Sequence, residues 1–158
     1  MTPVILLEEL KKFIEESTKN ILLETKNKEK NCERVPKVIL GNLPRKEAET
    51  NDVPYIVLKF LTGKDLQEAG APTEAKAKIR ILAVTYSEDR SKGYIDALNV
   101  ITKIRFDLLM KRVVGKYFKL DLPVEYIVYE EDISPYTIAE MVCNFDIPPI
   151  EQEVNKWL

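Results

Sequence analysis

The side chains of this sequence that could take part in chemistry are carboxylates, lysines, arginines, tyrosines and two cysteines, because the chain contains no histidine. Without histidine, the Ser-His-Asp and Cys-His systems of nucleophilic catalysis cannot be built, and the commonest zinc ligand is missing. The densest acidic cluster is Glu130-Glu131-Asp132. Three adjacent carboxylates lack the ligand spacing of a hard-cation site, so a solvated turn is the favoured interpretation.

Two further patterns give only weak chemical signals. Gly63-Lys64-Asp65 matches a fragment of a phosphate-binding loop, but the rest of the required glycine and lysine spacing is missing. Cys32 and Cys143 stand at no metal-ligand spacing and are interpreted as a loop thiol and a small core residue. We therefore expect no catalytic residue, no metal site and no cofactor.

The composition is that of an ordinary globular domain. The chain has 158 residues, of which 45% are hydrophobic and 32% charged, with a formal net charge of -2. This length predicts a single domain over residues 1–158. The apolar runs fall short of the ~18–20 residues that span a bilayer, so no membrane association is expected. No basic segment followed by an apolar one opens the sequence, so no secretory signal is expected.

Two long segments place apolar residues at helical spacing. The first predicts a helix over about residues 3–25, with Thr2 as its N-cap and Pro3 in its first turn. The second predicts a helix over about residues 93–114, capped by Ser91 and ended by Gly115.

Segments rich in β-branched and aromatic residues predict the strands. The strands are expected at residues 35–40, 54–61, 77–86, 117–122, 124–129 and 138–147. Loops are expected at residues 41–53, 63–73, 88–92 and 130–136, and a short tail at residues 151–158. The order predicts an α+β fold, in which the N-terminal helix and the long central helix pack on one face of a mixed or antiparallel sheet of four to five strands.

Charge is distributed unevenly along the chain. Residues 93–118 carry five basic and two acidic side chains, which gives +3, whereas residues 119–158 carry two basic and nine acidic ones, which gives -7. Opposed charges of this kind suit subunits that stack against unlike neighbours. The acidic chain shows no interleaving of basic and aromatic residues, so sequence-specific nucleic-acid binding is not expected.

Three motifs between residues 54 and 150 form a more specific pattern. A strand ending at Tyr86 runs through a polar loop into Gly93-Tyr94 and a long helix, Pro135-Tyr136 precedes the last strand, and Ile147-Pro148-Pro149 follows it. This pattern resembles the tail terminator proteins of long-tailed bacteriophages and prophages, which are also called tail completion or minor tail proteins. The helix expected at the N-terminus also fits that family.

The resemblance implies a structural role without covalent chemistry. Proteins of that family close into a ring, commonly a hexamer, on the finished tail tube, stop the addition of tube subunits and offer a surface to the head connector. DNA would pass through the ring without sequence-specific binding, and the protein would be found in the virion tail, or in the host cytoplasm during assembly. A ring needs two different patches on each subunit. The residues expected at the subunit or tail-tube interface are Tyr86, Glu88, Asp89, Arg90, Tyr94, Lys103, Arg105, Lys111 and Arg112.

Three other functions stay open at this stage. The chain could be a head-tail connector or neck subunit of the same fold type, which would bind on the head side of the junction. It could be a carboxylate-and-metal nuclease that uses Asp89, Asp96 or residues 130–132. It could also be a small binding module of unrelated function.

Overall fold

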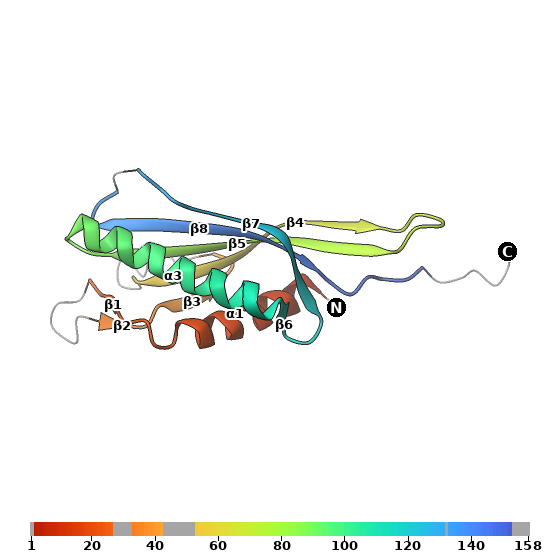
Figure 1. Ribbon diagram of the computed structural model, residues 1–158, viewed down its shortest axis with the longest axis horizontal. Coiled ribbons are helices and arrows are strands. Elements are labelled where there is room, and N and C mark those ends of the chain that lie inside the picture. The colour runs from red at the N-terminus through yellow and green to blue at the C-terminus, as the bar shows by residue number, and fades with distance from the viewer. Residues whose placement is uncertain (1, 27–32, 43–52, 132, 153–158) are drawn as a thin grey trace.

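The computed structural model describes residues 2–26, 33–42, 53–131 and 133–152. It is an α+β fold in which a mixed sheet of six strands, in the order β3-β4-β5-β8-β7-β6, is packed against helices α1 and α3 (Figure 1). The sheet is mixed because β3 (Lys37–Leu40) runs parallel to β4 (Tyr55–Leu66), whereas the other neighbours are antiparallel. The expected α+β class is confirmed, with six strands where four to five were predicted.

Helix α1 (Pro3–Thr18) begins as predicted and ends early. The Thr2 side chain accepts a hydrogen bond from Ile5 N, and Leu6, Leu10 and Ile14 are fully buried. The helix stops at Thr18, whose hydroxyl donates to Ile14 O, and the chain then forms β1 (Leu23–Glu24), which pairs with β2 (Glu33–Arg34). The prediction of helix up to residue 25 was wrong because three consecutive apolar residues at 21–23 imitate a helical period.

Helix α3 (Arg90–Lys111) is displaced toward the N-terminus from its predicted range. Asp89 caps it instead of Ser91, so three residues assigned to the preceding loop form its first turn. At its other end Arg112 adopts φ 61, and Val113–Val114 form β6, which pairs with the next strand. The β-branched pair leaves the helix because valine favours extended backbone.

The hairpin of β4 and β5 (Glu74–Tyr86) is longer than predicted. The prediction of a loop over residues 63–73 was wrong at its start, because Gly63 pairs with Ala77 and Leu66 with Glu74. Figure 1 shows this end of the hairpin projecting beyond the helices. Glycine and charged residues are weak strand formers, so the sequence gives little sign of strand here; cross-strand pairing with β5 supplies it.

Two predicted strands merge into β7 (Phe118–Val128). The pairing of β7 with β8 (Tyr136–Asp146) shifts register between Asp121 and Glu125, a bulge that includes Pro123. Proline cannot donate to a ladder and is tolerated at bulges and edges, so it deforms the strand without ending it.

Alternating side chains of the strands build two apolar clusters on opposite faces of the sheet. One cluster joins α1 and α3 to the sheet, so both helices cover the same face, as predicted. Strand β5 shows the alternation clearly: Ile79 and Ile81 enter the helix-covered core, whereas Val84 and Tyr86 enter the second cluster. Each fully buried large aliphatic side chain contributes about 1.5–3 kcal/mol. Within the described ranges, no helix has the length and apolar character needed to cross a membrane.

Candidate assembly surface

The start of α3 is held in place by two side chains that precede it in the chain. Asp89 Oδ1 accepts hydrogen bonds from Ser91 N at 3.0 Å and Lys92 N at 3.4 Å, which satisfies the free amides of the first turn. Thr85 on β5 donates its hydroxyl to Gly93 O at 3.0 Å. The first turn is therefore fixed both to its own cap and to the neighbouring strand.

A side chain at position 93 would be closely packed against its neighbours. A Cβ atom at this position would lie 3.2 Å from Thr137 Oγ1 and 3.5 Å from Ser87 Cβ. The first turn of α3 can therefore approach β8 closely because residue 93 lacks a side chain.

Two motifs that are distant in the sequence meet at this end of the sheet. The rings of Tyr86 and Tyr136 pack edge to face, with centroids 5.7 Å apart and an interplanar angle of 61°. Beside them, Ser87 N donates to Pro135 O at 3.0 Å. The strand-to-helix motif around Tyr86 and the motif Pro135-Tyr136 thus form one structural unit.

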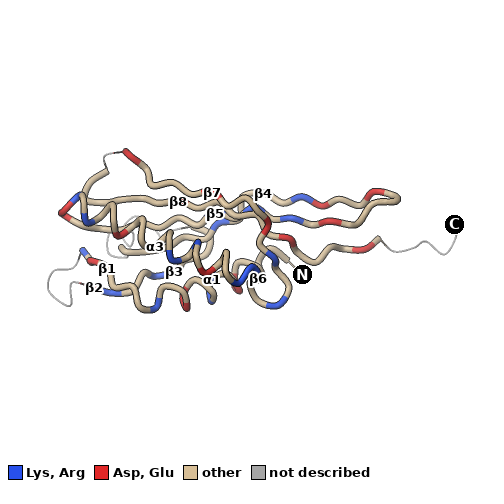
Figure 2. Tube along the Cα trace, viewed as in Figure 1, with Lys and Arg blue, Asp and Glu red and all other residues tan. Residues whose placement is uncertain are grey.

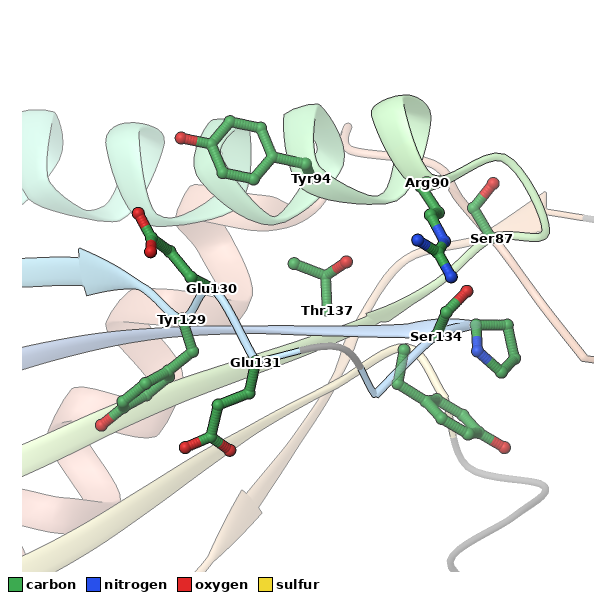
Figure 3. A pocket seen from close by; sticks show the side chains of 10 residues that line it. Ser87, Arg90, Tyr94, Tyr129, Glu130, Glu131, Ser134 and Thr137 are labelled. Atoms are coloured by element: carbon green, nitrogen blue, oxygen red, sulfur yellow. The ribbon is translucent and has the colours of Figure 1, made fainter.

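A pocket of about 310 Å³ opens between α3 and the segment that joins β7 to β8 (Figure 3). Arg90 and Tyr94 line it from α3, and Tyr129, Glu130 and Glu131 line it from the end of β7 and the segment beyond. Charged side chains of both signs and tyrosines thus line one open hollow. Glu130 and Glu131 are exposed, as expected for a solvated turn, and Asp132 lies outside the described residues.

The structure separates the nine residues expected at an interface. Tyr86 is only 6% exposed and belongs to the second apolar cluster, whereas Tyr94 is 47% exposed. Glu88 is exposed and immediately precedes the cap residue Asp89. Arg90 lines the pocket.

The four basic residues expected at an interface between residues 103 and 112 have different surroundings. Lys103 pairs with Asp107 at 3.0 Å, and Lys111 lies 5.4 Å from the ring centroid of Phe13 on α1. The guanidinium carbon of Arg105 instead lies 4.7 Å from the ring centroid of Tyr126 on β7. Arg112 Nε donates a hydrogen bond to Leu109 O at 3.2 Å. Figure 2 shows basic and acidic residues interspersed along the chain, so the charge separation of the sequence is less marked in space.

The carboxylates considered for metal chemistry lie in different surroundings. Asp89 is occupied by capping α3. Burial raises the pKa of Asp96, and nearby Lys92 only partly opposes this effect. Across the described ranges, no group of three cysteine or carboxylate side chains is placed to hold a metal ion.

One polar cluster was missed by the sequence analysis. Glu140 on β8 is 7% exposed, accepts a hydrogen bond from Arg80 Nε at 2.7 Å and accepts a second from the Tyr129 hydroxyl. The bond to Glu140 raises the pKa of Tyr129. A glutamate between Ala139 and Met141 in a strand was the available signal, since buried carboxylates are rare unless they are paired.

Comparison with known proteins establishes the fold only. No model of a protein family matches the sequence, and no curated protein matches it. A protein of known structure superimposes on this chain with a TM-score of 0.52 and 9% sequence identity, over 95% of both chains. Similarity at this identity shows a shared architecture and carries no information on activity or partners.

Proposed function

We propose that this protein is a structural subunit of a bacteriophage or prophage tail, a tail terminator that forms a ring on the tail tube. The ring, a hexamer in this proposal, stops the addition of tube subunits and presents a surface to the head connector. Its subunits contact one another and the terminal tube subunits, and DNA passes through the ring.

The observation that carries this proposal is the contact between Tyr86 and Tyr136. The family resemblance depends on motifs that are scattered over the sequence, and a chance match gives no reason for them to be neighbours. The tyrosine contact, together with the Ser87–Pro135 hydrogen bond, joins two of these motifs. Strand β8 then leads from Tyr136 to the third motif, which starts at Ile147.

The surface chemistry of the described residues also suits a subunit. The pocket beside α3 is open and is lined by both charged and apolar groups, and α3 carries exposed apolar side chains, Tyr94, Ile95, Phe106 and Met110 among them. Exposed large apolar residues on a helix that already buries its other face are typical of interaction surfaces. A head-to-tail ring would cover two different patches of this kind on each subunit.

The test is to mix the purified protein with tail tubes of the same phage and examine them by negative-stain electron microscopy. We expect a ring at one end of each tube, and tubes assembled in its presence to stop growing. Rings on the portal instead of the tube would favour the head-tail connector alternative. Binding to neither particle would contradict the proposal.

The nuclease alternative has its own test. DNA is incubated with the protein and Mg²⁺ or Mn²⁺, and the same reaction is run with Glu130 and Glu131 both changed to alanine. We expect no cleavage in either reaction. Cleavage by the native protein that the double variant loses would overturn the structural role in favour of an enzyme.

A further inference from the structure

The outer edge of β7 is open over most of its length. On its inner side β7 pairs with β8 as far as Val128. On its outer side β6 reaches only Lys119, and a further hydrogen bond joins Leu120 N to Arg112 O. Beyond that point no described strand pairs with the outer side of β7. An open edge of this kind is a template for an added strand.

The backbone of β7 shows which groups are available for pairing. Tyr129 N donates to Ile138 O at 2.9 Å, which directs residue 129 toward β8. Because alternate residues of an antiparallel strand face opposite neighbours, Tyr126 and Val128 direct their N–H and C=O groups outward. These residues lie beyond the bulge at Pro123, in regular register with β8.

Exposed apolar side chains lie along this edge, together with the carboxylate of Glu125 and one cation. Leu122, Tyr126 and Ile127 are 47%, 45% and 53% exposed. Arg105 of α3 lies over the Tyr126 ring, its Nε is buried without a hydrogen-bond partner, and among the described residues no carboxylate pairs with it. The edge therefore offers backbone groups, apolar surface and an uncompensated guanidinium, a combination that suits an extended segment containing carboxylates.

The chain contains such a segment after β8, and the name tail here covers residues 147–158, the expected tail at residues 151–158 together with the four residues before it. Ile150 is 70% exposed, and the segment combines the carboxylates Glu151 and Glu153 with the apolar residues Val154 and Trp157. The prolines before Ile150 cannot donate hydrogen bonds, so only the residues after them can form a strand ladder.

The tail of the same molecule is directed away from β7. Ile147 N donates to Ala75 O at 3.0 Å, and Gln67 Nε2 donates to Ile150 O at 2.5 Å, so the hairpin of β4 and β5 holds the start of the tail. Strand β5 lies on the other side of β8 from β7. Figure 1 shows the described part of the tail running outward beside this hairpin.

We propose that the tail of a second copy of this chain adds to the open edge of β7 as a strand, with Glu151 and Glu153 facing Arg105. The contact joins different patches of the two copies, so it can repeat from subunit to subunit. In the proposed ring, this strand addition would be the contact between neighbouring subunits. The strand addition itself does not depend on the proposed function; only the closure of the subunits into a ring does.

The decisive experiment is a charge exchange in the full-length chain. We compare the self-association of native protein, Arg105→Glu and the double variant Glu151→Arg/Glu153→Arg by sedimentation velocity over a concentration series. In each variant alone, residue 105 of one copy and residues 151 and 153 of the next copy carry the same charge. We therefore expect the dissociation constant for self-association to rise at least tenfold. In an equal mixture, each junction between one variant and the other again joins opposite charges. Association through alternating variants should therefore recover. Lys12→Glu on α1, where the Lys12 side chain is 74% exposed, is the matched control and should associate like the native protein.

Two results would overturn the inference: native-like association of both variants, or a mixture that associates no better than its components. Circular dichroism checks that each variant is folded. If Arg105→Glu does not fold, the double variant Glu151→Arg/Glu153→Arg is paired instead with Arg105→Gln, which should weaken association by a smaller factor.

Hydrogen exchange of backbone amides is a second test, because strand addition forms backbone hydrogen bonds and a contact between side chains alone does not. On raising the protein concentration, the outward amides of Tyr126 and Val128 should become protected by at least tenfold, whereas the Tyr129 amide is already bonded to β8. Unchanged exchange of the outward amides in the associated state would contradict strand addition. Strand addition without rings on tail tubes would leave this inference standing and refute the proposed function.

Discussion

Arg80 Nε donates a hydrogen bond to Glu140 Oε1 at 2.7 Å, which links the side chains of two neighbouring strands, β5 and β8. Tyr129, the residue that follows β7, donates to the other oxygen of the same carboxylate, so β5, β8 and the end of β7 meet at one buried acidic group. A buried carboxylate is stabilising only while its partners are in place.

The first prediction concerns this carboxylate. Glu140→Ala should lower the free energy of unfolding by about 1–3 kcal/mol, because Arg80 and Tyr129 lose their common acceptor. Urea unfolding followed by circular dichroism measures the loss. Glu125→Ala removes an exposed carboxylate from β7 and should change stability by less than about 0.5 kcal/mol. Equal effects of the two substitutions would show that the cluster contributes nothing of its own.

The second prediction concerns the contact between α1 and α3. Burial alone would raise the pKa of Asp107, but hydrogen bonds from Ser17 and Lys103 outweigh this effect and hold the pKa below its ordinary value. A carboxylate whose pKa is lower in the folded than in the unfolded protein stabilises the fold. This stabilisation is fully present above the unfolded-state pKa, about 3.9, and is lost as the pH falls through the folded-state pKa.

Native protein should therefore be more stable than Asp107→Asn near neutral pH, and this difference should shrink as pH falls below about 4. Denaturant titrations at several pH values measure it. The exposed Asp65, on the hairpin, is the control, because Asp65→Asn should change stability little at any of these pH values. A difference that stays constant down to acidic pH would rule out this role for the Asp107 charge.

The third prediction concerns the close approach of α3 to β8. Gly93→Val should destabilise the protein by about 1–3 kcal/mol, because the new side chain meets Thr137 and Ser87. Valine is a better helix former than glycine, so propensity alone predicts the opposite sign. Asn99→Val at an exposed position of the same helix is the control. Thermal unfolding decides between the two signs.

The fourth prediction concerns Cys143. Burial raises the pKa of this thiol to about 12, so it is neither accessible nor ionised near neutral pH. In a Cys32→Ser variant, which leaves Cys143 as the remaining thiol, a disulfide reagent should react in the native state only as fast as the protein opens. Full reaction should follow in denaturant. Rapid labelling of the folded variant would place Cys143 at the surface.

Sequence reasoning predicted the elements whose pattern is set by local burial. The alternation of β5 and the apolar spacing of α1 and α3 were sufficient to predict their type, because each element buries one regular set of side chains. The boundaries were less predictable: Val113 and Val114 suit either the end of a helix or a strand, and pairing with β7 decides between them. Strand β7 was divided in two because Pro123 indicates an end, whereas the bulge accommodates it.

The candidate site was predictable only in part. The polar residues around Asp89 and Tyr94 stand out in the sequence, because they separate a strand from a helix. Their pairing with the segment around Pro135 depends on β5 and β8 being neighbours, which no local pattern specifies. The cluster around Glu140 and the stack of Arg105 on Tyr126 likewise depend on contacts between distant strands and helices.

The position of β5 between β4 and β8 has a consequence for the time course of folding. Its first partner, β4, is synthesised before it, but β8 begins only at Tyr136, after the whole of α3 and β7. At about 5–20 residues per second, a ribosome needs several seconds to supply the missing strand. During this interval the nascent hairpin exposes its unpaired edge, and α1, followed by α3, is available to shield its face. Conditions that slow translation between these strands should therefore increase aggregation without changing the stability of the finished protein.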